Sequence, residues 1–560
     1  MGGRQLTVKR LSADFLIIGG GTAGCGAALS FCGVSGGSVL IIEKANIERS
    51  GCLAAGVNAL NAYILPGQTP EDYADYVRRD AEYIIREDLV LTMAEGLNRA
   101  ARRLEELGLT ILKDADGNYA ARGKRNIKIN GENIKPLLAG AVRKAPRIAV
   151  LERAAAIGYI VRDGRVLGVY AIGTDEPVLY AVRAKAVLCA TGGAAGLYRP
   201  NNPGFSRHKM WYPPFNTGAG YAMGIRAGAE MTTFEMRFIA LRCKDTIAPT
   251  GTLAQGVGAK QVNALGEAYE EKYGVTTSQR VHGTARENAE GRGPCYLRTV
   301  GITPDQDEEL YRAYLNMSPS QTLKWIESGL APSAQNVEIE GTEPYIVGGH
   351  TASGYWVDTD RETTIGRLFA AGDVAGGCPQ KYVTGALAEG EIAARSALKY
   401  MHDAWPSLSA AETDALRHGL EEILNRAPAA DTEDSLEAEM QAVMDEYAGG
   451  IGAGYAFSEA SLAAAARKIR DIESRSEKLA AKDMRELVYI FELRDRLTVC
   501  ASVIAQLAAR RETRWHSFAE NTDYPEKSGQ WLKFVNSRLE NGEIRIILRD
   551  LVKRGDRYEH

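Results

Sequence analysis

The chain has 560 residues, of which 45% are hydrophobic and 25% charged, and its formal net charge is -4 at pH 7. This composition is typical of a globular protein built from two to four structural units. The weakly acidic balance argues against a nucleic-acid polymer as the partner, and no apolar run approaches the roughly 18 residues of a membrane-spanning helix.

The N-terminal segment predicts a strand, a glycine-rich turn, a helix and a second strand. The sequence FLIIGGGTAG places Gly19, Gly21 and Gly24 in the spacing G-x-G-x-x-G directly after an apolar strand. Glycines so spaced allow a tight turn, a close approach of backbone N–H groups to a pyrophosphate, and helix–strand packing. Glu43 ends the second strand, where an acid accepts hydrogen bonds from ribose hydroxyls. We therefore expect a dinucleotide here, with Lys44 beside it.

The next elements are read from periodicity. Residues 71–109 have helical spacing of apolar side chains and predict two helices. Residues 147–190 alternate around Asp163 and Gly164, which predicts a hairpin that leads into a buried strand.

Two later strand ends favour FAD over NAD. The first is an ATGG turn, and the second is an AAGD turn followed by a helix that begins near TGALAEG. The second resembles the flavoprotein element in which an Asp contacts the FAD ribitol and a helix N-terminus favours negative charge on the flavin. The cofactor residues expected from these turns are Thr191, Gly192, Gly193, Asp373, Ala386 and Glu389.

The fold class expected is α/β, with a Rossmann-like FAD-binding domain, an inserted α+β capping domain and a C-terminal helical domain. The FAD-binding domain takes residues 1–235 and 346–400, and the capping domain takes the irregular segment 236–345 between them. Residues 401–560 form the last domain, because the chain from 407 to 511 is rich in Ala, Glu and Arg with helical periodicity.

The sequence ERSGCLAAGVN after Glu43 resembles the segment that runs along the flavin in succinate dehydrogenase and fumarate reductase flavoproteins. The resemblance implies that Ser50 and Gly51 lie against FAD. Covalent members of that group carry their attachment His at the place that Gly51 occupies here, so the FAD is expected to be non-covalent.

A longer set of motifs resembles the alpha subunit of adenylylsulfate reductase, and the resemblance covers nearly the whole chain. The motifs are IERSGCLAAGVNALNAYI, NGENIKP, MWYPPFNTG, FEMRFIALRCKD, EPYIVGGH, RETRW and TDYP. The resemblance implies reduction of adenylylsulfate to sulfite and AMP, or the reverse, through a flavin N5–sulfite adduct.

The same resemblance implies a substrate site. Asn61, Arg242 and His350 would surround the sulfate, Trp211 would lie against the flavin and substrate, and Glu132 would shape the nucleotide pocket. A planar, always charged guanidinium suits an oxyanion, and fixed donors stabilise charge that develops on leaving oxygens.

The adenine slot departs from the family pattern. The expected slot residues are Leu253, Gln255 and Tyr382, where Gln255 stands in place of a bulky apolar residue and Tyr382 in place of a Phe. A 3′-phosphorylated nucleotide or a smaller sulfur oxyanion therefore remains an alternative substrate.

Two other functions are open. A fumarate-reductase-type enzyme would reduce a C=C bond with a proton from an Arg, but that Arg falls on His282, with Arg286 close by. The other is a flavin-carrying electron-transfer subunit without a substrate of its own.

The eight cysteines form no CxxC pair, so neither a metal site nor an iron–sulfur cluster is expected in this chain. Scattered thiols and the lack of a signal-peptide pattern indicate a cytoplasmic protein. The resemblance implies that electrons pass through a ferredoxin-like beta subunit with two [4Fe-4S] clusters. An apolar stripe along residues 484–511 is interpreted as helix packing rather than a subunit contact.

Overall fold

The computed structural model describes residues 4–65, 67–514 and 520–560. Trp515, which ends the RETRW motif, lies outside the described residues, as does the side chain of Gln255.

A seven-stranded sheet forms the centre of the FAD-binding domain, in the order β7-β2-β1-β10-β9-β8 with β17 also paired to β10. The strands β7, β2, β1, β10 and β17 are parallel, and β9 and β8 add an antiparallel hairpin. Parallel strands are covered on both faces, which is why β2 is buried along its whole length. The bounds are β1 (Thr7–Ile18), β2 (Val39–Ile42), β7 (Ile148–Leu151), β8 (Ala154–Arg162), β9 (Arg165–Gly173), β10 (Val178–Cys189) and β17 (Leu368–Ala370).

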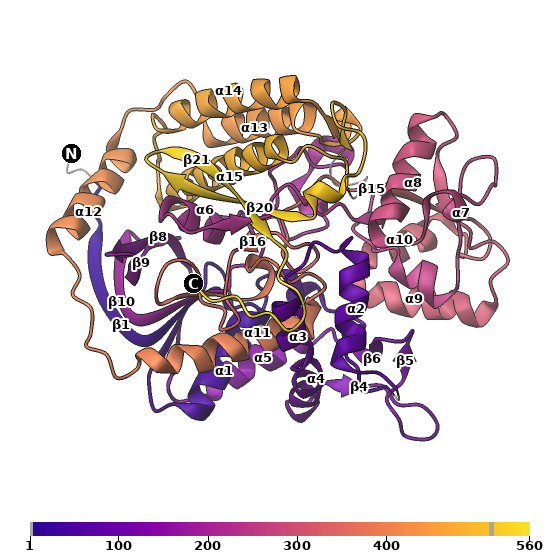
Figure 1. The fold of residues 1–560 in the computed structure, drawn as a ribbon, viewed down its shortest axis with the longest axis horizontal. Helices are drawn as coiled ribbons and strands as arrows, with labels where there is room; N and C mark the ends of the chain where they lie inside the picture. Colours follow the sequence, from indigo (N-terminus) through magenta and orange to yellow (C-terminus); the bar gives the residue numbers. More distant parts are fainter. Residues whose placement is uncertain (1–3, 66, 515–519) are drawn as a thin grey trace.

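Helices α1, α5 and α11 pack beside one another at this sheet (Figure 1). They span Thr22–Val34, Ile134–Lys144 and Tyr382–Ala397. The predicted α/β fold class and the strand–turn–helix–strand unit are confirmed. The predicted hairpin turn is also present, with Asp163 and Gly164 at φ of 50° and 69°.

Three helices stand where two were predicted after the first β-α-β unit. They are α2 (Pro70–Asp80), α3 (Glu87–Ala94) and α4 (Leu97–Glu106). Between α2 and α3 the chain turns through Glu82 and Tyr83, both at positive φ, which periodicity does not reveal. A small sheet combines β3 (Ala59–Asn61), which precedes α2, with β4 (Thr110–Ile111), β5 (Ala121–Arg122) and β6 (Asn126–Asn130), which follow α4.

The inserted segment forms a separate sheet and helical layer, seen at the right of Figure 1. Its strands run in the order β12-β15-β14-β13. The bounds are β12 (Leu241–Cys243), β13 (Gln261–Val262), β14 (Cys295–Leu297), β15 (Val337–Gly341), α7 (Glu270–Tyr273), α8 (Thr277–Ala289), α9 (Pro304–Met317) and α10 (Pro319–Ser328). Capping boxes at Thr276 and Thr303 fix the starts of α8 and α9.

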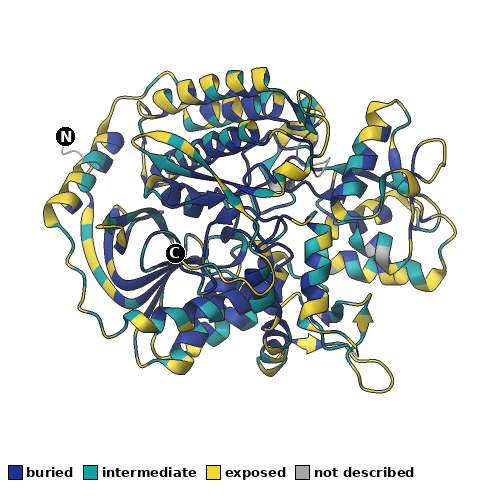
Figure 2. Ribbon diagram, viewed as in Figure 1, coloured by how far each residue is buried: buried dark blue, intermediate teal, exposed yellow. Residues whose placement is uncertain are grey.

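The C-terminal part is helical as expected, but it is not helical throughout. Its helices are α12 (Ala410–Asn425), α13 (Glu433–Tyr447), α14 (Glu459–Ser476) and α15 (Met484–Ala509). Most of the predicted stripe of α15 is buried, and α15 packs against α14, whose outer face is exposed (Figure 2). Beyond α15, the hairpin β20 (Lys533–Glu540) and β21 (Glu543–Asp550) joins β11 (Met231–Thr232), which also pairs with β16 (Gly354–Tyr355). The domain boundaries themselves stay a prediction.

Three short elements complete the described ranges, namely α6 (Ala219–Arg226), β18 (Ala456–Phe457) and β19 (Glu520–Asn521). Over those ranges, no helix combines the length and the apolar character that crossing a bilayer requires. The cytoplasmic location stays a prediction.

Candidate active site

A cavity of about 1380 Å³ opens at the carboxyl ends of β1, β2, β10 and β17. Ligands of open α/β sheets bind at this edge, because the strands there deliver their turns to one place. The capping segment and α15 supply further parts of the wall.

The β1–α1 turn forms one wall, where Gly19 and Gly21 line the cavity. Gly19 has a φ of 100°, and a Cβ there would lie 2.5 Å from the carbonyl oxygen of Ala190. A Cβ on Gly24 would lie 2.0 Å from the carbonyl oxygen of Gly19, so this residue packs the helix against the turn from behind. The turn thus presents backbone N–H groups and a helix N-terminus to a ligand.

The end of β2 places an acid and a base beside that turn. Glu43 accepts hydrogen bonds from the backbone N–H of Gly20 and of Ala45, both at 2.9 Å, and it lines the cavity. Lys44 also lines it and pairs with Glu492 at 2.5 Å.

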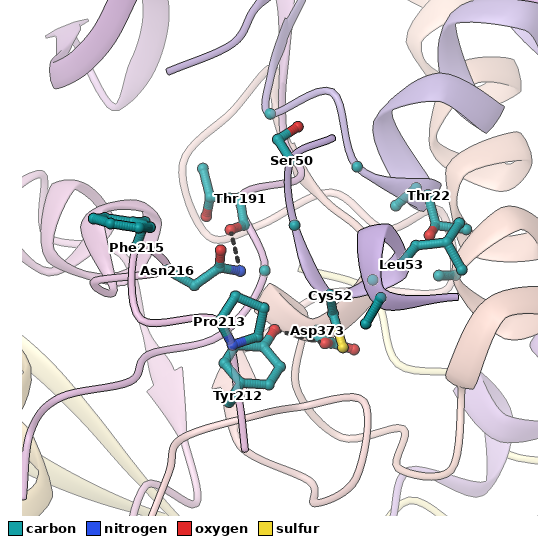
Figure 3. Close-up of a pocket in the computed structure, with 18 of the residues that line it drawn as sticks. Thr22, Ser50, Cys52, Leu53, Thr191, Tyr212, Pro213, Phe215, Asn216 and Asp373 are labelled. Carbon is teal, nitrogen blue, oxygen red and sulfur yellow. Dashed lines mark hydrogen bonds between the residues drawn. The ribbon is translucent and has the colours of Figure 1, made fainter. Parts of the chain in front are cut away.

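The middle of the cavity is formed by two turns that face each other, Ser50-Gly51 and Thr191-Gly192 (Figure 3). The hydroxyl oxygen of Ser50 is buried and has no hydrogen-bond partner among the described residues, so it is free to bond a ligand. Across from it, the Tyr212 hydroxyl donates to Asp373 over 2.8 Å.

Helix α11 begins at the cavity and contributes Ala386 to its wall. Glu389 is fully buried behind the wall. Its carboxylate accepts from the backbone N–H of Gly372 at 2.9 Å and pairs with Lys381 at 3.0 Å. Among the described residues, Gly24, Gly193 and Glu389 lie behind the cavity wall rather than in it, and their contact with the cofactor stays a prediction.

Asn61, Trp211, His350 and Tyr382 line the same cavity. The imidazole of His350 stacks on Phe238 with centroids 4.3 Å apart, and it meets the rings of Trp211 and Tyr382 edge-on at 5.2 and 5.1 Å. Asn61 donates from its amide nitrogen to the Tyr73 hydroxyl at 2.7 Å. The fold therefore brings together four of the predicted substrate residues.

The surroundings of His350 keep it neutral. Burial lowers the pKa of His350 to about 4, although the nearby charge of Asp373 opposes this. At neutral pH the ring therefore has one N–H donor and one acceptor nitrogen.

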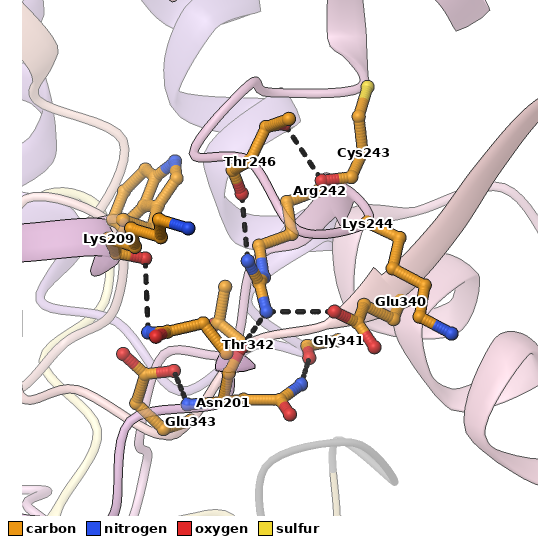
Figure 4. Close-up of polar contacts among 12 residues, drawn as sticks. Asn201, Lys209, Arg242, Cys243, Lys244, Thr246, Glu340, Gly341, Thr342 and Glu343 are labelled. Atoms are coloured by element: carbon orange, nitrogen blue, oxygen red, sulfur yellow. Dashed lines mark hydrogen bonds and ion pairs between the residues drawn. The ribbon is translucent and has the colours of Figure 1, made fainter. Parts of the chain in front are cut away.

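The structure does not bring Arg242 to the cavity, which corrects the sequence prediction. The antiparallel register places Glu340 directly opposite Arg242, and the two form an ion pair at 2.8 Å (Figure 4). A second donor reaches the carbonyl oxygen of Thr246 at 2.8 Å. Because side chains alternate along a strand, Leu241 lines the cavity while Arg242 faces the opposite side.

Two other predicted substrate residues also lie outside the described wall. Glu132 is exposed, and Leu253 is fully buried in the hydrophobic core. Gln255 contributes no described side chain.

Sequence reasoning missed several basic residues of the wall. Arg122, Lys124 and Arg125 come from the β5–β6 turn, and Arg280 comes from α8. The run RGKR, eight positions before NGENIKP, was the available signal, but its proximity to the cavity depends on tertiary structure.

Comparisons with known proteins agree with this geometry. The FAD binding domain family matches residues 14–382. The adenylylsulfate reductase subunit alpha of Megalodesulfovibrio gigas is 29% identical over 94% of this chain and 93% of its own. The solved adenylylsulfate reductase of Archaeoglobus fulgidus is 32% identical, with a TM-score of 0.93 and 98% of each chain covered. The chain belongs to the adenylylsulfate reductase family. A structure of adenosine-5-phosphosulfate reductase in complex with sulfite (covalent adduct) matches with the same identity and coverage and a TM-score of 0.94.

This membership confirms the family expected from the motifs and makes the protein an FAD-dependent oxidoreductase. The residues present fit that cofactor. Gly19, Gly21 and the start of α1 suit its pyrophosphate, and Glu43 suits its ribose. The unpartnered Ser50 hydroxyl and the N-terminus of α11 suit the flavin ring system.

Proposed function

We propose that the protein interconverts adenylylsulfate with sulfite and AMP. In the reductive direction the bond between sulfur and the bridging phosphate oxygen breaks, sulfur gains two electrons, and sulfite and AMP leave. Bound FAD supplies or accepts those two electrons.

The observation that carries the proposal is the meeting of Asn61, Trp211, His350 and Tyr382 in one cavity with the cofactor turns. These residues come from β3, the 210–218 segment, the loop before β16 and the start of α11. Their shared wall, together with membership of the family, supports chemistry on a small oxyanion next to the flavin.

Each of these side chains has a task that its surroundings support. Neutral His350 offers an N–H to an oxyanion oxygen, and its stacking on Phe238 fixes the ring plane. Asn61 is held by Tyr73, whose hydroxyl in turn donates to the carbonyl oxygen of Gln380 at 2.6 Å. Fixed donors of this kind stabilise developing charge without reorganisation during the reaction. Trp211 adds an aromatic face to the same wall and contacts the His350 ring.

Electrons must reach this site from another protein. Each cysteine in the chain is a free thiol in the structure, and the sequence has no second glycine motif for a nicotinamide. We propose a ferredoxin-like beta subunit with two [4Fe-4S] clusters as the donor. Co-expression with such a subunit should give a stable complex, and purification of the two chains as separate species would count against it.

The test adds sulfite, with and without AMP, to the purified FAD-loaded protein and records the visible flavin absorbance. Sulfite alone should bleach the flavin band, and AMP should make sulfite reduce ferricyanide. An unresponsive flavin would contradict the proposal.

The same preparation distinguishes the alternatives. A fumarate-reductase-type enzyme would reduce fumarate with a viologen donor, and a pure electron carrier would show neither activity. The positions suggested for a proton donor give the former no support. His282 pairs with Glu520 at 3.1 Å, Arg286 pairs with Glu290 at 3.7 Å, and neither lines the described cavity.

A further inference from the structure

Arg122 is a partly buried cation that the site described so far does not use. It ends β5 and lines the cavity, and its guanidinium donates to the side-chain oxygen of Asn58 at 2.7 Å. Its Nε atom is buried without a hydrogen-bond partner in the described chain. Burial lowers the pKa of Arg122, and among the described residues no carboxylate pairs with it.

A partly buried guanidinium without a carboxylate partner costs free energy. Removing a guanidinium from water carries a desolvation penalty that an anion normally offsets, and a buried N–H left unbonded adds to it. Arg242 shows the usual solution, because Glu340 compensates it. We therefore expect a ligand to supply the anion that pairs with Arg122, as Glu340 does for Arg242.

The location of Arg122 indicates which part of a ligand it meets. The side chains of Tyr382, at the start of α11, and of Tyr314, in α9, lie near its guanidinium. Tyr382 is also the ring that meets His350 at 5.1 Å. Arg122 thus lies beside the substrate group, on the side of the capping segment.

Five further arginines line this cavity, and two of them, Arg125 and Arg280, come from the β5–β6 turn and from the capping segment. Arg125, at the other end of the same turn, lies over the ring of Tyr76 at 3.5 Å. Arg280 projects from α8, and its Nε is buried and unpartnered in the described part of the molecule. The turn and the capping helix therefore both supply positive charge.

We propose that Arg122 binds the phosphate of the nucleotide sulfate, the group that separates from sulfur in the reaction. This inference rests on the proposed function. The sulfur of the substrate must meet the flavin beside His350, so the phosphate, one bridging oxygen further, faces outward toward Arg122. A planar guanidinium holds two phosphate oxygens at once, which suits a residue that orients the leaving group. This role differs from the one expected of Arg242, which was placed around the sulfate.

The experiment compares the FAD-loaded wild type with Arg122→Gln and Arg122→Lys. Loss of one charge-assisted contact should raise the KM for AMP in ferricyanide reduction roughly 10- to 100-fold in Arg122→Gln. Bleaching of the flavin by sulfite alone should stay unchanged, because sulfite lacks the phosphate. Arg122→Lys keeps the charge but not the planar fork, so its KM should lie between those of wild type and Arg122→Gln.

Adenosine provides a second measurement, by calorimetry on the same proteins without turnover. The wild type should bind AMP more tightly than adenosine, and Arg122→Gln should lose most of that preference while binding adenosine as before. Arg286→Gln is the matched control, since Arg286 is exposed and pairs with Glu290 away from the described wall. It should behave as wild type.

The outcomes separate the two proposals. A wild type whose flavin ignores sulfite overturns the proposed function, and the inference with it. If sulfite bleaches the wild-type flavin but Arg122→Gln still prefers AMP over adenosine as the wild type does, only the inference is overturned. If Arg122→Gln fails to retain FAD, Arg122→Lys decides, and an unchanged KM for AMP in that variant also overturns the inference.

Discussion

At the scale of single residues, the fold gives two arginines opposite tasks. Arg242 belongs to a motif that resembles the family closely, yet its cross-strand neighbour Glu340 pairs with it behind the wall. Arg122 belongs to a basic turn that no sequence motif marked as functional. It nevertheless lines the cavity without a carboxylate partner in the described chain. The two roles differ because the groups around an arginine in space determine whether its charge is paired within the protein. For both residues, those groups come from segments far apart in sequence.

His350 gives a prediction about pH at this scale. Because its pKa is lowered to about 4, the ring should stay neutral across the usual imidazole range near 6.5. A protonated imidazole quenches a nearby indole, and the Trp211 ring lies 5.2 Å away. The tryptophan emission of wild type minus that of His350→Asn should therefore show no step between pH 8 and 5.5. A step centred near pH 6.5 that His350→Asn abolishes would contradict the lowered pKa.

The same pKa has a consequence for stability, and its sign follows from linkage. The unfolded chain takes up a proton at His350 near pH 6.5, before the folded protein does. The neutral ring therefore favours the folded state fully above pH 6.5, and this contribution is lost as the pH falls toward 4.

At the scale of elements, the β1–α1 unit shows how glycine spacing sets a site. Gly24 and Gly33 belong to the same helix, but a Cβ on Gly24 would meet the carbonyl oxygen of Gly19 at 2.0 Å, whereas a Cβ on Gly33 would meet nothing within 4 Å. One glycine is required by close packing and the other is not.

Alanine substitutions at these two positions should have opposite effects. Gly24→Ala should push α1 away from the turn and weaken FAD binding at least roughly tenfold, as one lost contact of about 1.4 kcal/mol suffices for that factor. Gly33→Ala should raise the free energy of unfolding by about 0.5–1 kcal/mol, because it only removes a flexible residue from a helix. Flavin fluorescence on release and urea unfolding measure the two effects. Normal FAD retention in Gly24→Ala would show that the turn tolerates displacement.

At the scale of the whole molecule, the C-terminal hairpin joins regions that are distant in sequence. Glu230, just before β11, is fully buried and accepts hydrogen bonds from Asn536 at 2.6 Å and from Arg549 at 2.8 Å. Burial acts to raise the pKa of Glu230, but the hydrogen bonds from Arg549 and Asn536 outweigh it and hold the pKa below its usual 4.5. The carboxylate thus fastens the last strands to the FAD-binding domain.

Glu230→Gln should lower the free energy of unfolding by roughly 1.5–3 kcal/mol at pH 7, the range for hydrogen bonds to a charged group. The difference from wild type should shrink as the pH falls below 4.5, because the stabilisation from a lowered carboxyl pKa is lost when the folded protein protonates. Urea unfolding at several pH values measures this. Glu543→Gln, at an exposed position of β21, should change stability by no more than about 0.5 kcal/mol. Equal effects of the two substitutions would contradict the role of Glu230.

The sequence by itself determined the features that depend on neighbours along the chain. An apolar strand, three spaced glycines and Glu43 were enough to predict the dinucleotide unit, because a tight turn and helix packing impose local steric demands. The long α15 stripe predicted a buried helix for the same kind of reason. The FAD-binding family followed from motifs of this type.

Only the tertiary structure decided which charged side chains face the cavity. Strand register turned Arg242 toward Glu340, and the packing of the capping segment on the FAD-binding domain exposed Arg122 to the cavity. Tertiary packing also placed residues 533–550 as strands beside β11, within a domain that the sequence predicted to be helical. Register and packing between distant segments depend on the sum of many weak contacts, and no local pattern in the chain encodes that sum.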